Sequence, residues 1–282
     1  MEEVGTAKVF SFFDDAKKVR QATNSEIRAG DGHPVSSYFE LAKKVAELQF
    51  YNQEHVLFFR GQSTDFKNSA RNTTLKPSAL RSDPKSPLAP PNQTDLRSRF
   101  EELKHYEYRL VQLLEFNETL GRQRVARHRI LRWSILQHYE KCDTPLLDVS
   151  QSIRIAASFA SMGKGQTAFV YVLAVPNVSG VISASAEAGL QTVKLAGICP
   201  PNAVRPYIQE GYLLGEYPEM PDFDQKQHYR HYEIDFGRRL IAKFRLDLHS
   251  FWADPDFPMV TRAALYPNAR DPLFKLLKPL GK

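Results

Sequence analysis

A nearly unbroken apolar run, Thr167 to Val175, is the feature of the sequence that most constrains its fold. A run of this length and composition predicts a buried β-strand. A shorter apolar run, His55 to Phe59, predicts a second buried strand, which delivers Arg60 at its C-terminal end. Shorter patterns predict further strands over 146–150, 178–183, 211–214 and 238–246.

Helical patterns lie between these strands. Apolar residues recur at helical spacing over 35–50, directly after Pro34, and predict a helix there. Similar patterns predict helices over 95–120, 130–139 and 152–160. Because helices and strands do not alternate regularly, we expect an α+β fold with a mixed, largely antiparallel sheet flanked by helices. Residues 1–34 are polar and are expected to form an irregular segment, and residues 35–282 a single domain.

Composition excludes several classes of protein. The 282 residues include two cysteines, Cys142 and Cys199, which are too few for a disulfide scaffold or a four-cysteine zinc site. No apolar run approaches the roughly 20 residues of a membrane helix, and the acidic N-terminus lacks the apolar core of a secretory signal. We therefore expect a cytoplasmic protein with no membrane partner. A net charge of +6 favours polyanionic partners only weakly.

Several catalytic motifs are absent from the sequence. It has no Gly-rich phosphate loop followed by Lys-Ser/Thr, no G-x-G-x-x-G after a strand, no H-E-x-x-H and no G-x-S-x-G. These absences argue against P-loop NTPases, Rossmann dehydrogenases, zincins and α/β-hydrolases.

The first candidate cluster is Arg60, Gly61 and Gln62 at the end of an apolar strand. An arginine fork suits a phosphate or a carboxylate, and a glycine would let a ligand approach the backbone closely. The alternative is a solvated strand end or an internal salt bridge.

The second cluster joins His138 to the segment that follows Pro145. Period two places Asp148 and Ser150 on one face of a strand, and the free N–H groups of a helix beginning near Ser152 could hold an anion. The alternatives are that the serines only cap this helix and that His138 is a core histidine.

The third cluster is Arg205, Gln209 and Glu210, just before Gly211. A carboxylate beside an amide could orient a ribose hydroxyl or stabilise a cationic transition state. The alternative is a polar surface turn. The densest basic stretch, 122–132, could contact a nucleic-acid backbone or could only solubilise a helix.

Four segments, taken in order, resemble the FRG domain, which is named for a Phe-Arg-Gly motif. They are FFRGQ, LKPSALR, LQHYEKCDTPLLDVSQSIRIAASFA and RPYIQEGYLL, and they extend from about Val56 to Leu214. The resemblance implies that 35–282 is an FRG-type domain. The chain departs from the family at Pro145 and Val149, where the family has arginine and tryptophan.

The order of these motifs is also similar to that of ADP-ribosyltransferases, which implies an ADP-ribosyltransferase-like fold with NAD as co-substrate and no metal. An arginine ending an early strand matches Arg60, a Ser-x-Ser segment before a helix matches Ser150 and Ser152, and a late acidic segment matches Gln209 and Glu210. The resemblance implies that NAD contacts Arg60, Gly61, Gln62, Ser150 and Ser152. It implies catalytic roles for His138, Asp148, Gln209 and Glu210.

The implied reaction is ADP-ribosyl transfer to an unknown protein or nucleic acid, or hydrolysis of NAD. The resemblance further implies a role as a toxin or an antiviral-defence effector. The alternative is a non-catalytic module that binds a nucleotide or a nucleic acid. The departures at Pro145 and Val149 favour this alternative.

Overall fold

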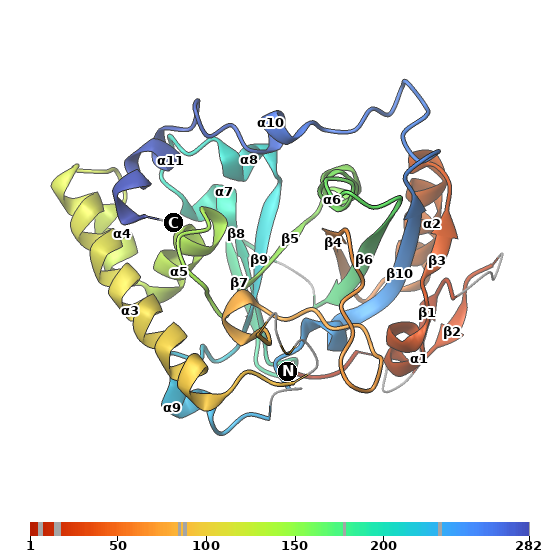
Figure 1. Cartoon of the computed structure of the whole chain (residues 1–282), viewed down its shortest axis with the longest axis horizontal. Helices are drawn as coiled ribbons and strands as arrows, with labels where there is room; N and C mark the ends of the chain where they lie inside the picture. The colour runs from red at the N-terminus through yellow and green to blue at the C-terminus, as the bar shows by residue number, and fades with distance from the viewer. Residues whose placement is uncertain are drawn as a thin grey trace. The chain divides into compact units, whose positions relative to one another are not determined.

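The structure is a computed structural model that describes residues 1–4, 8–13, 18–83, 86, 89–176, 179–230 and 233–281. The chain forms two compact units, and each unit is assembled from three separate stretches. Unit 1 comprises Met1–Leu75, Val149–Val178 and Asp235–Arg262. Unit 2 comprises Lys76–Asp148, Ser179–Ile234 and Ala263–Lys282. Figure 1 labels the elements of both units along the chain.

Unit 1 contains a mixed sheet. Its strands lie in the order β3 (His33–Val35), β10 (Leu240–Asp247), β6 (Thr167–Val175), β4 (Val56–Gln62) and β5 (Leu147–Ser150). The chain passes from unit 2 to unit 1 within β5, between Asp148 and Val149. β3 runs parallel to β10, whereas the β10–β6, β6–β4 and β4–β5 pairs are antiparallel. The other elements are the antiparallel pair β1 (Val9–Ser11) and β2 (Arg20–Ala22), the helices α1 (Asn24–Ala29), α2 (Tyr38–Tyr51) and α6 (Ile153–Ala160), and the 3-10 turn η2 (Phe236–Arg239).

The apolar run that dominates the sequence is β6. It pairs with β4 on one side and with β10 on the other, and every residue from Val170 to Val175 is buried. A strand with neighbours on both edges and cover on both faces needs apolar side chains throughout, which explains the unbroken run. The predicted strand at 167–175 is confirmed.

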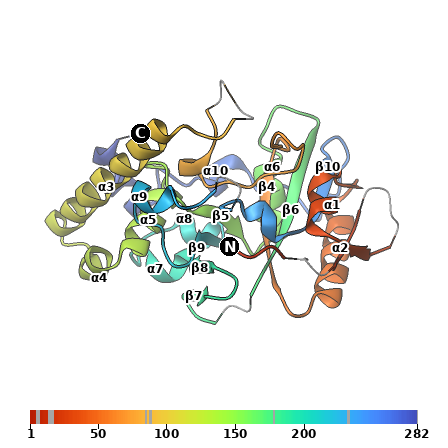
Figure 2. The ribbon, with the colours of Figure 1, turned by 90° about the horizontal axis from the view of Figure 1, so that it is seen from below.

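Helix α6 packs directly against β4 at Gly61, and both views of the ribbon draw the two elements side by side (Figures 1 and 2). A Cβ atom built on Gly61 would lie 1.8 Å from the carbonyl oxygen of Ala156 and 2.7 Å from the backbone nitrogen of Ala160. The helix backbone therefore occupies the space that a side chain would need. Alanines on the packing face of α6 allow this close approach.

A buried charged cluster lies on the sheet of unit 1. The ammonium of Lys243 donates hydrogen bonds to Asp65 Oδ2 (2.8 Å), to Thr73 Oγ1 (2.8 Å) and to the carbonyl of Gly30. The hydroxyl of Tyr171 donates to Asp65 Oδ1 at 3.1 Å. Burial lowers the pKa of Lys243 and raises that of Tyr171. These bonds hold the loop that follows β4 against β6 and β10. The buried ammonium of Lys243 and the buried carboxylate of Asp65 therefore neutralise each other.

Unit 2 contains an antiparallel sheet with helices packed on it. Its strands lie in the order β9 (Gly211–Glu216), β8 (Leu190–Lys194) and β7 (Ile182–Ser185). The longer helices are α3 (Gln93–Phe116) and α5 (Arg129–His138). The shorter elements are α4 (Arg122–Arg127), α7 (Leu195–Ile198), α8 (Arg205–Ile208), α9 (Phe223–Lys226), α10 (Arg262–Leu265), α11 (Pro272–Leu276), η1 (Ser78–Leu80) and η3 (Lys278–Leu280).

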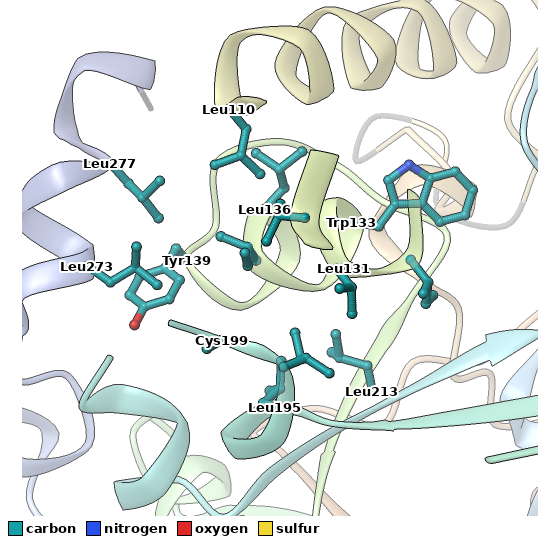
Figure 3. Packing of buried hydrophobic residues seen from close by; sticks show 14 of the residues in the cluster. Leu110, Leu131, Trp133, Leu136, Tyr139, Leu195, Cys199, Leu213, Leu273 and Leu277 are labelled. Atoms are coloured by element: carbon teal, nitrogen blue, oxygen red, sulfur yellow. The ribbon is translucent and has the colours of Figure 1, made fainter. Parts of the chain in front are cut away.

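The core of unit 2 gathers around α5. Figure 3 shows Leu131 and Leu136 of this helix between Leu110 of α3 and Leu213 of β9. Leu273 and Leu277 close the cluster from the C-terminal segment of the chain (Figure 3). These apolar contacts fix the end of α5, which carries His138.

The predicted α+β fold with a mixed, largely antiparallel sheet is confirmed, but several local predictions are wrong. The segment expected to be irregular holds β1, β2 and α1, and Thr23 begins α1 with a capping box to Glu26. The helix predicted to reach residue 120 ends at Phe116, and α4 follows it. Residues 177 and 178 lie outside the described residues, and the strand predicted there runs instead from Ile182 to Ser185.

We predict that Gly61→Ala destabilises the protein strongly. The new methyl group would collide with backbone atoms of α6, which cannot move without shifting the whole helix, so we expect a loss of about 3 kcal/mol in the free energy of unfolding. Urea unfolding followed by circular dichroism measures this loss. Gly165→Ala is the matched control, because its Cβ would meet Thr167 O at an ordinary 3.5 Å, and it should change stability by less than about 0.5 kcal/mol. Equal stability of the two variants would contradict the packing argument.

Candidate functional site

The structure divides the candidate residues into two groups, one in each unit. Unit 1 contains Arg60, Gly61, Gln62, Ser150 and Ser152. Unit 2 contains His138, Asp148, Gln209 and Glu210. Each group is described within its own unit.

Arg60 lies within β4 and does not follow its end, because the strand continues to Gln62. Arg60 is opposite Tyr171, and Gln62 is opposite Phe169, so period two places these four side chains on one face of the sheet. Arg60 and Gln62 are half-buried. The charge of Arg60 acts on the phenol of Tyr171 and offsets part of the rise that burial causes in its pKa. The guanidinium is thus close to the buried charged cluster of Lys243 and Asp65.

Gly61 points to the other face of β4. The close approach that this glycine permits is that of the backbone of α6, which fills the space beside its Cα. A ligand therefore has no space to contact Gly61 from that side, contrary to the prediction.

The two serines act at the start of α6. Ser152 is the N-cap, since its hydroxyl accepts from the backbone N–H of Ile155 at 3.4 Å. The hydroxyl of Ser150 accepts from the N–H of Ser152 at 3.0 Å. The capping alternative is confirmed for Ser152, and a role of either serine in binding NAD stays a prediction.

His138 is the most unusual residue of the second group. Its side chain is 2% exposed at the end of α5, and burial, with a smaller contribution from the positive charge of Arg205, lowers its pKa well below 6.5. The imidazole is therefore neutral at pH 7. Among the described residues its Nε2 atom has no hydrogen-bond partner. A buried polar atom without a partner costs free energy, and it marks a position where a ligand could supply one.

Asp148 is next to this imidazole and is more open to solvent. Its carboxylate is 41% exposed, and its Oδ1 lies 4.0 Å from Nδ1 of His138, which is too far for a hydrogen bond. The side-chain amide of Gln137 donates to the other oxygen, Oδ2, at 2.5 Å. Gly211 lies beside the ring: a Cβ there would be in ordinary contact with His138 Cε1 at 3.5 Å, whereas it would crowd Leu195 Cδ1 at 2.8 Å.

Gln209 and Glu210 do not point the same way. Gln209 is buried at the end of α8, and its amide donates to the carbonyl of Leu265 at 2.8 Å. Glu210 is exposed and has a φ of +45°, a backbone conformation that costs free energy in a residue other than glycine. The surface-turn alternative therefore describes Glu210 but not Gln209.

Sequence reasoning missed the polar contacts that hold α8 and the end of α5. Arg205 donates to Glu140 Oε1 at 2.7 Å, and its guanidinium lies 4.6 Å from the ring centre of Tyr266. Asp271 begins α11 and accepts hydrogen bonds from the hydroxyl of Tyr139 and the backbone N–H of Arg205. No local pattern pairs residues so far apart in the sequence.

Among the described residues, no group of three or more His, Cys, Asp or Glu side chains is placed to hold a metal ion. No helix in the same part of the chain is long and apolar enough to cross a membrane.

Comparison with protein families gives one match. Residues 55–168 match the family model of the FRG domain, so the chain contains an FRG domain. The matched stretch includes the first and second candidate clusters but not the third, which is Arg205, Gln209 and Glu210. No curated protein and no solved structure matches the chain, so its similarity to ADP-ribosyltransferases stays a prediction.

We predict that His138 makes stability depend on pH. The unfolded chain binds a proton at this histidine near pH 6.5, whereas the folded chain does not, so stability is fully present above pH 6.5 and falls as the pH decreases. Between about pH 7.5 and pH 5.5 this loss should be about 1.4 kcal/mol in the wild type and absent from His138→Gln. Urea unfolding at both pH values measures the difference. The same pH dependence in both chains would show that His138 is protonated in the folded state.

Proposed function

We propose that the chain binds NAD, breaks the bond between nicotinamide and ribose, and passes the ADP-ribose to a macromolecule or to water. The observation that carries this proposal is the neutral imidazole of His138, with a buried Nε2 that has no partner among the described residues, beside the half-exposed carboxylate of Asp148. Both groups lie in the matched FRG domain.

The chemistry of the pair suits a ribose. A neutral imidazole can accept a hydrogen bond from a ribose hydroxyl through Nε2, and this contact would remove the cost of the buried nitrogen. Breaking the glycosidic bond builds positive charge on the ribose, so a carboxylate held by Gln137 stabilises the transition state more than the ground state. We therefore assign ribose binding to His138 and charge stabilisation to Asp148.

In unit 1 the predicted ligand contact is Arg60. A guanidinium can hold a pyrophosphate through two parallel hydrogen bonds, and Gln62 lies on the same face of β4. Ser150 and Ser152 keep their predicted contacts with the nucleotide in addition to their hydrogen bonds at the start of α6. A cytoplasmic location and a role as toxin or antiviral effector are further parts of this proposal.

The second candidate function is a module that binds a nucleotide without chemistry. It is favoured by the third cluster, because the amide of Gln209 is bonded to Leu265 and Glu210 is on an exposed turn. A binding module needs neither residue to face the ligand.

We predict that the chain releases nicotinamide from NAD and that Asp148→Asn lowers this rate about 10²- to 10³-fold with little change in NAD affinity. Radiolabelled NAD, with and without cell lysate, measures release and transfer, and calorimetry measures affinity. Asp224→Asn, which changes an exposed carboxylate on α9, is the matched control and should behave like the wild type. Glu210→Gln tests the rival assignment of the catalytic carboxylate.

The possible outcomes separate the two functions. NAD that binds but stays intact with every acceptor would favour the binding module. No measurable affinity for NAD would overturn the proposed NAD chemistry.

A further inference from the structure

The end of α3 and the adjoining α4 form an exposed surface that the proposed function does not use. The α3–α4 surface consists of Tyr108, Gln112, Phe116, Leu120, Arg124 and Arg127. Phe116 is 88% exposed, Leu120 71% and Tyr108 65%. Scattered exposed apolar residues are ordinary, but three large ones within thirteen residues need an explanation.

The aromatic side chains share the outer side of α3. Tyr108, Gln112 and Phe116 follow one another on successive turns, while Leu103, Leu110 and Leu114 on the other side are buried in the core of unit 2. The rise of a helix separates Tyr108 from Phe116 by about 12 Å along its axis. The two rings are therefore separate, and each exposes a flat apolar face to a partner.

Helix α4, which packs on α3, carries Arg122, Arg124 and Arg127. Arg122 pairs with Glu115 at 3.1 Å, and Arg129 and Arg132 both pair with Glu107. Arg124 and Arg127 are exposed, and among the described residues no carboxylate lies within ion-pair distance of either one. The surface thus offers two guanidinium groups to an anionic partner.

We infer that the α3–α4 surface binds a single-stranded nucleic acid. Guanidinium groups contact phosphates, and exposed aromatic rings stack on unpaired bases of any sequence. A duplex hides its base faces, so it would use the arginines alone. Nucleic acid would also be the acceptor class of the proposed ADP-ribosyl transfer, and only this acceptor role rests on the proposed function.

The same residues fit an anionic membrane less well. A helix that lies on a lipid surface buries one continuous apolar face. Here the polar Gln112 separates Tyr108 from Phe116, and two carboxylates, Glu115 and Glu118, flank Phe116. Arg122 neutralises the charge of Glu115, so this carboxylate does not repel a nearby phosphate. An ion pair still remains polar and opposes insertion among lipid chains.

The test measures fluorescence anisotropy of labelled 20-nucleotide single-stranded RNA and DNA at several salt concentrations, without NAD. We expect binding that weakens with salt. Arg124→Ala with Arg127→Ala should reduce the slope of log affinity against log salt by about 1.4, because each phosphate contact on a single strand contributes about 0.7. Phe116→Ala should weaken binding about 5- to 100-fold and leave this slope unchanged.

Two controls each remove one residue of the same type elsewhere. Arg97→Ala removes an exposed arginine about 28 Å from Phe116 along α3, and Phe50→Ala removes a phenylalanine that is 66% exposed on α2. Both should bind like the wild type. Melting temperatures of all variants check that the fold is intact.

Three outcomes would overturn the inference. They are absence of salt-dependent binding, equal losses in the controls and the variants, and tighter binding to vesicles of 70% phosphatidylcholine and 30% phosphatidylserine than to the single strands. Since NAD is absent from the assay, failure here leaves the proposed NAD chemistry untouched, and failure to release nicotinamide leaves this inference untouched.

Discussion

The contact of α6 with Gly61 determines how unit 1 presents its candidate residues. Because the helix backbone lies where a side chain of residue 61 would be, only glycine fits this position of β4. Period two then directs Arg60 and Gln62 to the opposite face, toward Tyr171 and Phe169 of β6. In the Phe-Arg-Gly motif, Gly61 therefore packs against α6, and Arg60 lies on the opposite face of β4.

A second glycine, Gly211, begins β9 in unit 2, and a Cβ there would lie 2.8 Å from Leu195 Cδ1. The ring of His138 beside it is held at the end of α5 by the apolar core. Both glycines thus act through protein contacts. The proposed ligand contacts are polar groups near them, namely Arg60 in unit 1 and the pair of His138 and Asp148 in unit 2.

Local patterns predicted the long elements well, because periodicity and burial coincide there. β6, α6 and the helix after Pro34 follow directly from their apolar spacing. The N-terminal strands were missed, because three-residue strands exist only through their tertiary partners. The amide of Gln209 bonds to Leu265, and Lys243 to Asp65, and no local pattern connects residues at such separations. The local hint of this buried cluster was Lys243 itself, a charged residue within the largely apolar strand β10.

The way the chain passes between the units has a consequence for its synthesis. β6 is paired with β4, which precedes it, and with β10, which is made much later. As the ribosome extends the chain, one edge of an apolar strand stays without its neighbour until Leu240–Asp247 has emerged. The stretch that matches the FRG domain ends at residue 168 and cannot complete this sheet. A nascent chain halted before β10 would expose that edge, which makes it a natural client for chaperones.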